Sequence, residues 1–447
     1  MEKINLPDFI ITAINLLEKK GFEGYVVGGG VRDKLLGREP DDWDIATNAK
    51  PDDIKAIFKK HFDTGIKYGT VTVLIDSFPI EITTYRIDGD YNDRRRPEKV
   101  TFANDLNSDL MRRDFTVNAI AYNPSKGLVD VCGGLHDLSH RVIRCVGDAD
   151  KRFEEDALRV LRALRFAAVL EFEIEPKTYK AICHHAYLLD KISAERISHE
   201  LTLLLMAKKG IEKLFDTGVG NILLPEVSQC FGVWQNNCEH IYDVGNHTLE
   251  VIYNTPKAPI LRYCALLHDI GKVQTKAVDK WGFDRFPNHA AVSAVMADNI
   301  LMRLKLSAKQ RKRIVKIIRL HSIIIKPDEV SVRKVVVKAG KEAFVDVIAL
   351  KKANAMAKSL CCEKQQLEQY KEIERIYYTD IKNNVPFSIK ELHIDGNDMQ
   401  ALGFKGDEIG KALKTLLMQV IKQPSLNNRH SLLEMAKSQK KEKKGER

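Results

Sequence analysis

The chain contains 447 residues, which is enough for about three domains with a hydrophobic core in each. Its formal net charge of +10 favours a polyanionic partner such as RNA. The eight cysteines are scattered without a CxxC pair, which indicates reduced thiols rather than a disulfide framework. Because the sequence lacks a signal-peptide pattern and an apolar run of membrane-spanning length, we expect a cytoplasmic protein with no membrane partner.

The first functional pattern lies at residues 28–44, GGGVRDKLLGREPDDWD. Residues 24–27 predict a strand and residues 31–36 predict a helix. A glycine turn between them would point backbone N–H groups to one side, which suits a phosphate. Asp42 and Asp44 are two residues apart where the next strand is predicted, so their carboxylates would project from one face and could hold Mg²⁺.

Each half of this segment has a simpler explanation by itself, because glycines form turns and exposed loops contain acids. Together they make the phosphate cradle and metal site that nucleotidyl transfer requires. The segment resembles the signature of the class II tRNA nucleotidyltransferases, the family of CCA-adding enzymes and bacterial poly(A) polymerases. The resemblance implies that Gly29 and Arg32 bind the nucleotide.

The predicted elements indicate an α+β fold. Residues 1–140 contain β-rich runs and short helices, which predict a small polymerase-β-like nucleotidyltransferase head with a mixed β-sheet. The resemblance implies three helical parts after the head: a neck at 141–205, a body at 206–370 with an HD-like domain at about 240–355, and a tail at 371–447. We expect the tail to bind tRNA and to end in a disordered basic segment from residue 437.

Three further features lie in the predicted head. Glu81 is an acid in a β-rich run that either faces water or joins the two aspartates as a third catalytic carboxylate. Residues 86–97 are charged and turn-rich, and in CCA-adding enzymes the matching segment is a flexible loop needed for switching to the final adenosine. In residues 112–122, RRDFTVNAIAY, Arg113 could neutralise a triphosphate and Asp114 predicts the N-cap of a helix. This string also resembles the family's second motif.

In the predicted neck, residues 154–166 predict one helix. Asp156, Arg159, Arg162 and Arg165 recur every third residue on it, so they form either a surface ion-pair stripe or a set that reads the edge of a base. The resemblance favours base reading, because the EDxxR motif of class II enzymes, here residues 155–159, selects CTP and then ATP. It implies nucleotide contacts for the other two arginines, and residues 194–201 match a motif that steadies this helix.

A second group of candidate ligands lies in the predicted body. His247 is followed by the pair His268 and Asp269, and two further histidines come later. Imidazole and carboxylate groups together suit a divalent metal that activates water, and the pattern resembles HD phosphohydrolase domains. Such a domain ends its ligand set with an aspartate, whereas Asn354 stands at the expected place. The body therefore either contains a second metal site or serves as a helical support for RNA without one.

These patterns predict a Mg²⁺-dependent enzyme that adds CMP, CMP and AMP from CTP and ATP to the 3′ end of tRNA, releasing pyrophosphate. Asp42 and Asp44 would hold two Mg²⁺ ions, Glu81 would assist them, and Gly29, Arg32 and Arg113 would hold the phosphates. A poly(A) polymerase or an enzyme that adds only part of CCA is the nearest alternative. An HD-type phosphohydrolase is the alternative of another class. The oligomeric state stays open.

Overall fold

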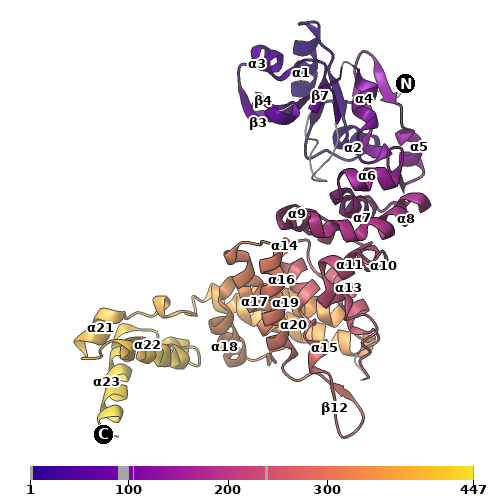
Figure 1. Ribbon diagram of the computed structural model, residues 1–447. Helices are drawn as coiled ribbons and strands as arrows, with labels where there is room; N and C mark the ends of the chain where they lie inside the picture. The colour runs from indigo at the N-terminus through magenta and orange to yellow at the C-terminus, as the bar shows by residue number, and fades with distance from the viewer. Residues whose placement is uncertain (1–3, 89–99, 104, 237–239, 446–447) are drawn as a thin grey trace. The chain divides into compact units, whose positions relative to one another are not determined.

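The computed structural model describes residues 4–88, 100–103, 105–236 and 240–445, and it divides into two compact units, Met1–Pro225 and Glu226–Arg447 (Figure 1). The predicted α+β class is confirmed, because the first unit contains a mixed sheet and the rest is mainly helical. Within the described part of the chain, no helix is both long and apolar enough to cross a bilayer. The predicted boundaries at residues 140, 205 and 370 stay predictions.

A seven-stranded sheet forms the centre of the head, with the strand order β3-β4-β5-β2-β1-β8-β9. The pair β2–β5 is parallel and the other neighbours are antiparallel, so the sheet is mixed, as predicted. Its strands are β1 (Tyr25–Val27), β2 (Asp44–Thr47), β3 (His61–Gly65), β4 (Thr70–Ile75), β5 (Phe78–Thr84), β8 (Ile120–Asn123) and β9 (Gly127–Asp130).

Helices cover both faces of this sheet. Helices α1 (Asp8–Glu18) and α3 (Pro51–Ile57) pack on β4 through buried side chains such as Ile14 and Ile54. On the other face, α4 (Leu106–Met111) packs Leu106 and Leu110 against strand residues that include Val27. The short helices α2 (Gly29–Leu35) and α5 (Gly134–Ser139) follow β1 and β9. The sheet therefore has a buried core on each side, and its candidate functional side chains lie at the strand ends.

One local prediction in the head is wrong. The helix predicted after Asp114 is a single 3-10 turn, η2 (Thr116–Asn118), followed by β8, all four residues of which are buried. A continuous apolar run fits such a strand as well as a helix. Of the predicted switching loop, residues 86–88 belong to the β6–β7 hairpin (Arg86–Asp88, Val100–Phe102), and residues 89–99 lie outside the described part.

The predicted neck helix at 154–166 is also wrong, since it is two helices. Helix α6 (Ala149–Glu155) ends at Asp156, whose φ of −140° is extended, and α7 (Leu158–Leu170) begins two residues later. The Asp156 Oδ1 atom accepts a hydrogen bond from the Leu158 N–H at 3.1 Å, which stabilises the break. The remaining helices of this unit are α8 (Pro176–His185), α9 (Ala194–Leu205), α10 (Lys213–Asp216) and α11 (Val219–Leu223).

The second unit is a helical bundle followed by a smaller group of helices. The bundle helices are α12 (Pro225–Ser228), α13 (Val244–Asn254), α14 (Pro259–Leu267), α15 (Lys272–Thr275), α16 (His289–Arg303), α17 (Ala308–Leu320), α18 (Glu329–Ala339), α19 (Lys341–Met356) and α20 (Leu360–Lys382). A hairpin, β12 (Ala277–Val278) and β13 (Asp284–Arg285), separates α15 from α16. The last helices are α21 (Gly396–Ala401), α22 (Asp407–Val420) and α23 (Arg429–Gly445), so residues 437–445 are helical where we expected disorder.

Candidate active site

The three candidate carboxylates meet at one edge of the head sheet. Asp44 is the first residue of β2, where it pairs with Val27 of β1 on one side and with Glu81 of β5 on the other. Burial, with smaller contributions from Glu81 and Asp42, raises the pKa of Asp44 to about 6 against the opposing Arg113 guanidinium. Carboxylates that crowd together in this way lack positive charge, so this edge fits a divalent cation.

The glycine turn lies at the same edge, because β1 leads directly into it. Gly28 has a φ of +71°, and a Cβ atom there would lie 2.9 Å from Nη1 of Arg113. A Cβ atom on Gly30 would lie 3.0 Å from the Trp43 ring. These two positions therefore need glycine, the first for its left-handed backbone as well as for space.

Arg32 and Arg113 are both held beside this turn. The buried Arg32 donates from Nε to Asp33 at 2.9 Å and from Nη1 to the Asn118 side-chain oxygen at 2.7 Å. Arg113 donates to Asp109 at 3.1 Å. Because a guanidinium has five N–H donors in a fixed plane, each arginine keeps donors for a phosphate while these carboxylates and the amide set its direction.

The candidate nucleotide-selecting residues lie on two helices of the neck. The ion pair considered for Asp156 and Arg159 is replaced by two others: Asp156 accepts from Arg196 of α9 at 2.7 Å, and Arg159 pairs with Glu155. The break at residue 156 explains the change, since it takes the aspartate off the face of α7. The segment 194–201 thus contacts residue 156 directly.

Ion pairs join Arg162 to both the head and α9, and Arg165 to α9. Arg162 donates to Asp114 at 2.6 Å and to Glu200 at 3.3 Å, and Arg165 contacts the other oxygen of Glu200 at 2.6 Å. Burial would raise the pKa of Asp114, but Arg162 and Asn118 hold it well below its usual range. The network keeps Asp114 as an anion that joins head to neck.

One aromatic ring connects the arginines. The guanidinium carbons of Arg32, Arg162 and Arg165 lie 5.1, 5.3 and 3.9 Å from the centre of the Phe166 ring. Phe166 is buried and meets Phe115 edge to face at 5.8 Å. Each contact lies within the range of a cation–π interaction, so a single ring positions a phosphate-binding candidate next to two base-reading candidates.

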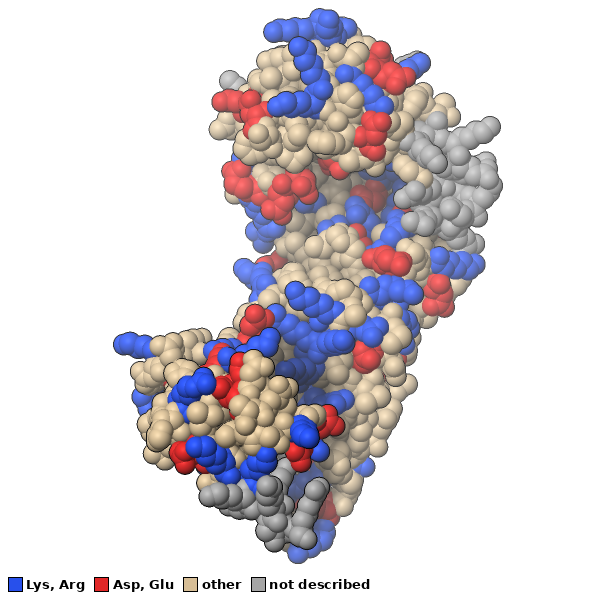
Figure 2. All heavy atoms as spheres, turned by 90° about the vertical axis from the view of Figure 1, so that its left-hand side faces the viewer, with Lys and Arg blue, Asp and Glu red and all other residues tan. Residues whose placement is uncertain are grey.

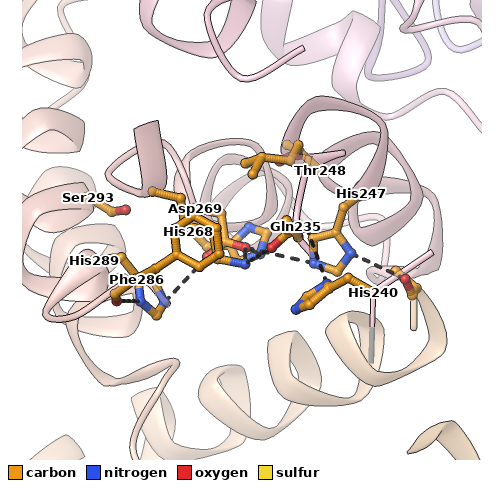
Figure 3. A network of polar contacts seen from close by, with 12 residues as sticks. Gln235, His240, His247, Thr248, His268, Asp269, Phe286, His289 and Ser293 are labelled. Carbon is orange, nitrogen blue, oxygen red and sulfur yellow. Dashed lines mark hydrogen bonds and ion pairs between the residues drawn. The ribbon is translucent and has the colours of Figure 1, made fainter. Parts of the chain in front are cut away.

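A separate polar cluster lies in the second unit and is drawn in Figure 3. The Nε2 atoms of four histidines face the Asp269 carboxylate: His247 at 3.8 Å, His268 at 3.2 Å, His289 at 3.5 Å and His321 at 3.4 Å. The predicted trio of His247, His268 and Asp269 is thus brought together with both later histidines.

Backbone carbonyls fix the tautomer of each ring. The four Nδ1 atoms donate to the carbonyl oxygens of residues 357, 265, 286 and 318, at 3.2, 2.8, 2.8 and 2.6 Å. A carbonyl oxygen only accepts, so each Nδ1 atom carries a proton, and in a neutral ring the Nε2 atom then presents a lone pair. Burial lowers the pKa of His247, His289 and His321, that of His321 to about 4, so these rings are neutral.

The Nε2 atoms therefore face the Asp269 carboxylate across a space that contains little positive charge. The Nε2 atoms of His289 and His321 are 3.3 Å apart, and among the described residues those of His247 and His268 have no hydrogen-bond partner. Lys272 supplies one cation, 2.7 Å from Asp269. This donor set fits a divalent metal of the type that prefers imidazole. Asn354 lines the adjoining cavity of about 320 Å³, and its side-chain oxygen also lacks a partner within the described part.

Comparison with known domains agrees with this geometry. The domain model "Poly A polymerase head domain" matches residues 24–144, and "Probable RNA and SrmB- binding site of polymerase A" matches residues 171–231. A third model, for domain 2 of tRNA nucleotidyltransferases, matches residues 287–436. All three models describe domains of poly(A) polymerases or tRNA nucleotidyltransferases, so three separate segments of the chain are similar to this family.

Individual proteins are similar to this chain over different lengths. The CCA-adding enzyme of Streptococcus thermophilus is 48% identical over 237 residues, which are 52% of this chain and 59% of that enzyme. The chain thus matches less than two thirds of the length of the curated relatives to which it is similar. The Bacillus stearothermophilus CCA-adding enzyme solved with CTP is 27% identical over 98% of both chains, with a TM-score of 0.75. The Thermotoga maritima enzyme, at 19% identity and a TM-score of 0.57, shares the fold over 98% of this chain.

Four residues that contact the candidate site residues were not singled out from the sequence: Asn118, Phe166, Arg196 and Glu200. The last two lie inside the motif at 194–201, and Asn118 lies inside the motif at 112–122, so their positions were visible without their partners. Phe166 gave no signal, because one more aromatic residue on an apolar helix is typical of a core.

Proposed function

We propose that the protein adds CCA to the 3′ end of tRNA, using CTP and ATP. The observation that carries the proposal is the meeting of Asp42, Asp44 and Glu81 beside the Gly28 turn and Arg113. The similarity to the CTP-bound Bacillus stearothermophilus enzyme over the whole chain supports the choice of substrate. Lysine and arginine side chains are numerous on the surface in Figure 2, as a polyanionic partner requires. A tRNA substrate also favours the cytoplasmic location that we predicted.

In this proposal Asp42 and Asp44 hold two Mg²⁺ ions, which supply positive charge to the triphosphate and make the 3′ hydroxyl of the RNA a better nucleophile when bound. Glu81 lies beside Asp44 as the third carboxylate, where it would help to activate the 3′ hydroxyl. Arg32 and Arg113 direct their remaining N–H donors at the phosphates, with Gly29 leaving room for them. The 3′ hydroxyl gives up its proton to this carboxylate edge while its oxygen forms a bond to the α-phosphorus, and the bond from that phosphorus to the pyrophosphate oxygen breaks with its electrons on the leaving pyrophosphate.

Selection of the base is assigned to the neck. Asp156 accepts from an exocyclic amine and Arg159 donates to a ring nitrogen or oxygen, the pairings that these side chains make with base edges. Arg196 holds Asp156, and Glu200 holds Arg162 and Arg165. The amino acids alone thus present the donor and acceptor pattern that a template base would otherwise supply.

The test is to incubate the purified protein with tRNA that lacks its 3′ CCA, supplying CTP alone, ATP alone or both, and to size the products. CCA addition predicts growth by the two cytidines with CTP alone and by the full triplet with both nucleotides. A long ladder with ATP alone would identify a poly(A) polymerase, and growth that stops after the cytidines would identify a partial enzyme. Asp42→Ala should abolish incorporation while CTP still binds.

A metal-dependent phosphohydrolase is a second candidate function, and the four imidazoles facing Asp269 are the observation that favours it. A metal held there would polarise a bound phosphate ester. The test is hydrolysis of p-nitrophenyl phosphate in the presence of added Mn²⁺, Co²⁺ or Ni²⁺. His268→Ala should remove this activity and Asp42→Ala should leave it unchanged. Absence of hydrolysis with every metal would reject this function and leave the transferase proposal untouched.

A further inference from the structure

The hairpin between α15 and α16 exposes an unusual amount of aromatic surface. Trp281 is 68% exposed at its turn, and Phe283 and Val278 are 45% and 64% exposed. Trp234, which comes from an earlier segment, is 65% exposed. Two of the chain's three tryptophans therefore lie in water, although large apolar side chains are normally buried unless they bind a partner. We call Trp234 and residues 277–285 the aromatic platform.

Specific hydrogen bonds join the two parts of this platform. Lys276 Nζ donates to the Trp234 carbonyl oxygen at 2.7 Å. The Asn236 N–H donates to Asp284 Oδ2 at 2.8 Å, and the Asp284 N–H donates back to the Asn236 carbonyl oxygen at 3.2 Å. The segment that carries Trp234 thus runs along the hairpin as an additional edge.

The turn that presents Trp281 is itself rigid. Oδ1 of Asp279 accepts hydrogen bonds from the N–H groups of Trp281 at 2.9 Å and Phe283 at 3.0 Å, and its Oδ2 accepts from Arg285 at 2.8 Å. Rings on a preorganised turn lose little conformational entropy on binding. The hydrogen bonds of the turn therefore hold Trp281 and Phe283 in their exposed positions.

The charges around the rings favour a nucleic acid. Lys280 places its ammonium 4.3 Å from the centre of the Trp281 ring. The two acids of the hairpin, Asp279 and Asp284, are paired with Arg285 and with Lys276, which directly precedes it. Residues 276–285 therefore carry three cations and two acids. Aromatic faces next to cations are the arrangement that binds stacked bases with their phosphates, whereas an apolar protein partner gains nothing from the lysine.

A positively charged cavity adjoins the platform. Gln235, next to Trp234, accepts a hydrogen bond from Lys272 at 2.7 Å. The cavity is lined by three lysines, Lys272, Lys351 and Lys358, and by one carboxylate, Asp269, which pairs with Lys272. Lys351 is only 8% exposed, and no carboxylate among the described residues pairs with it. A buried ammonium without a counter-ion needs an anion. A phosphate of a strand stacked on the platform would supply one.

We propose that the aromatic platform binds single-stranded RNA by stacking bases on Trp281 and Trp234. The platform lies in the second unit and is separate from the transferase site in the head. It supplies affinity for an unpaired segment of RNA whatever chemistry the head performs. Stacking is tolerant of sequence, because every base has a flat face, so the preference is for single strands over duplexes rather than for particular bases.

The test uses the full-length protein without CTP or ATP. A short fluorescein-labelled oligoadenylate and the same strand in a duplex are titrated, and binding is followed by fluorescence anisotropy. Trp234→Ala and Trp281→Ala should each weaken binding of the single strand about fivefold or more, and the double variant should weaken it further. Trp281→Phe keeps a stacking face and should retain most of the affinity. Tyr378→Ala, which removes an aromatic side chain that is 57% exposed on α20, is the matched control and should leave it unchanged.

The outcomes separate this proposal from its rivals. Unchanged binding of the single strand by the folded double variant, checked by circular dichroism, would overturn it. So would equal binding of single strand and duplex. If the double variant instead abolishes concentration-dependent self-association in sedimentation and leaves RNA binding intact, the platform binds a second copy of the chain and the RNA proposal is wrong. Asp42→Ala should bind the oligonucleotide as the wild type does, so failure of CCA addition leaves this test standing.

Discussion

Asp44 on β2 lies directly opposite Glu81 on β5 in the parallel register of the head sheet. Register partners on neighbouring strands project from the same face, so their carboxyl groups repel. Burial, together with Glu81 and Asp42, raises the pKa of Asp44 to about 6, against 3.8 for an ordinary aspartate. The ionised form of Asp44 is therefore energetically unfavourable in the fold, and Asp44 lies at the edge where we propose that metal binds.

The first prediction concerns the pH dependence of stability. Because the pKa of Asp44 is raised in the fold, the folded state binds more protons than the unfolded state between about pH 4 and pH 6. The free-energy cost of ionising Asp44 in the folded state is absent below about pH 4, grows as the pH rises and is complete above about pH 6. Asp44→Asn should thus stabilise the metal-free protein by about 1–3 kcal/mol at pH 8 and much less at pH 4.

Urea denaturation in EDTA at both pH values measures this difference, and nucleotide incorporation by Asp44→Asn should be lost. Asp63→Asn is the control, because Asp63 is an exposed acid of the same head, paired with Lys55. Equal stabilisation at pH 4 and pH 8 would contradict the assignment of the cost to the Asp44 carboxylate.

The second prediction concerns the Asp156–Arg196 ion pair. Both Asp156 oxygens accept from the Arg196 guanidinium, at 3.2 and 2.7 Å. Arg196→Met keeps the bulk of the side chain and frees the carboxylate to rotate, so discrimination between CTP and ATP should fall about tenfold, with a similar loss in Asp156→Ala. Single-nucleotide incorporation with each triphosphate measures it.

If the two residues act as one unit, the double variant should be no worse than either single variant. Lys213→Met removes the exposed pair with Glu173 in the same unit and should leave discrimination intact. Additive losses in the double variant would mean that Arg196 acts on the nucleotide by itself.

Features that depend on near neighbours in the sequence were predictable. The strand, the glycine turn and the DxD spacing specify their own geometry, because a left-handed glycine and the two-residue period of a strand are local. The break at Asp156 was not predictable, since residues 154–166 favour a helix and the partner that stabilises the break, Arg196, lies 40 residues away. The four buried residues of β8 gave no period, so a strand and a helix fitted them equally.

The same limit applies to the histidine cluster. The adjacent His268 and Asp269 were visible as a pair, whereas the inclusion of His289 and His321 depends on how α16 and α17 pack. The direction of each Nε2 atom depends on backbone carbonyls that no side-chain pattern encodes.

The third prediction concerns Phe166. Its ring faces three guanidinium groups, and each cation–π contact contributes about 0.5–2 kcal/mol, less the overlap among them. Phe166→Leu keeps an apolar side chain without the aromatic face, so the arginines lose their common support. We expect the KM for CTP to rise about tenfold with a smaller change in kcat.

Phe166→Tyr retains the ring face and should retain a lower KM than the leucine variant. Phe153→Leu is the matched control: Phe153 is a buried aromatic residue of α6 that packs on His185. It should lose comparable stability in thermal melts and keep the wild-type KM. A parallel rise of KM in both leucine variants would mean that general loosening of the neck, rather than the arginine contacts, sets nucleotide affinity.

The last prediction concerns metal at the histidine cluster. Four Nε2 lone pairs and one carboxylate converge there, and within the described part of the chain Lys272 is the lysine that pairs with Asp269. Removing a cation from such a site exposes uncompensated repulsion, so dialysis against a strong chelator should lower the Tm by several degrees. Elemental analysis of the purified protein should find about one divalent transition metal per chain.

His268→Ala should remove both the metal and the effect of the chelator, and His136→Ala, which removes an exposed histidine of the head, should remove neither. Asn354→Asp is the sharper variant. It adds a carboxylate to the cavity beside the cluster, and because a carboxylate binds a cation more strongly than an amide does, it should raise the chelator concentration needed to strip the metal. If the wild type contains no metal and melts at the same temperature with and without chelator, the ammonium of Lys272 alone compensates Asp269 and the cluster is a polar core of the bundle.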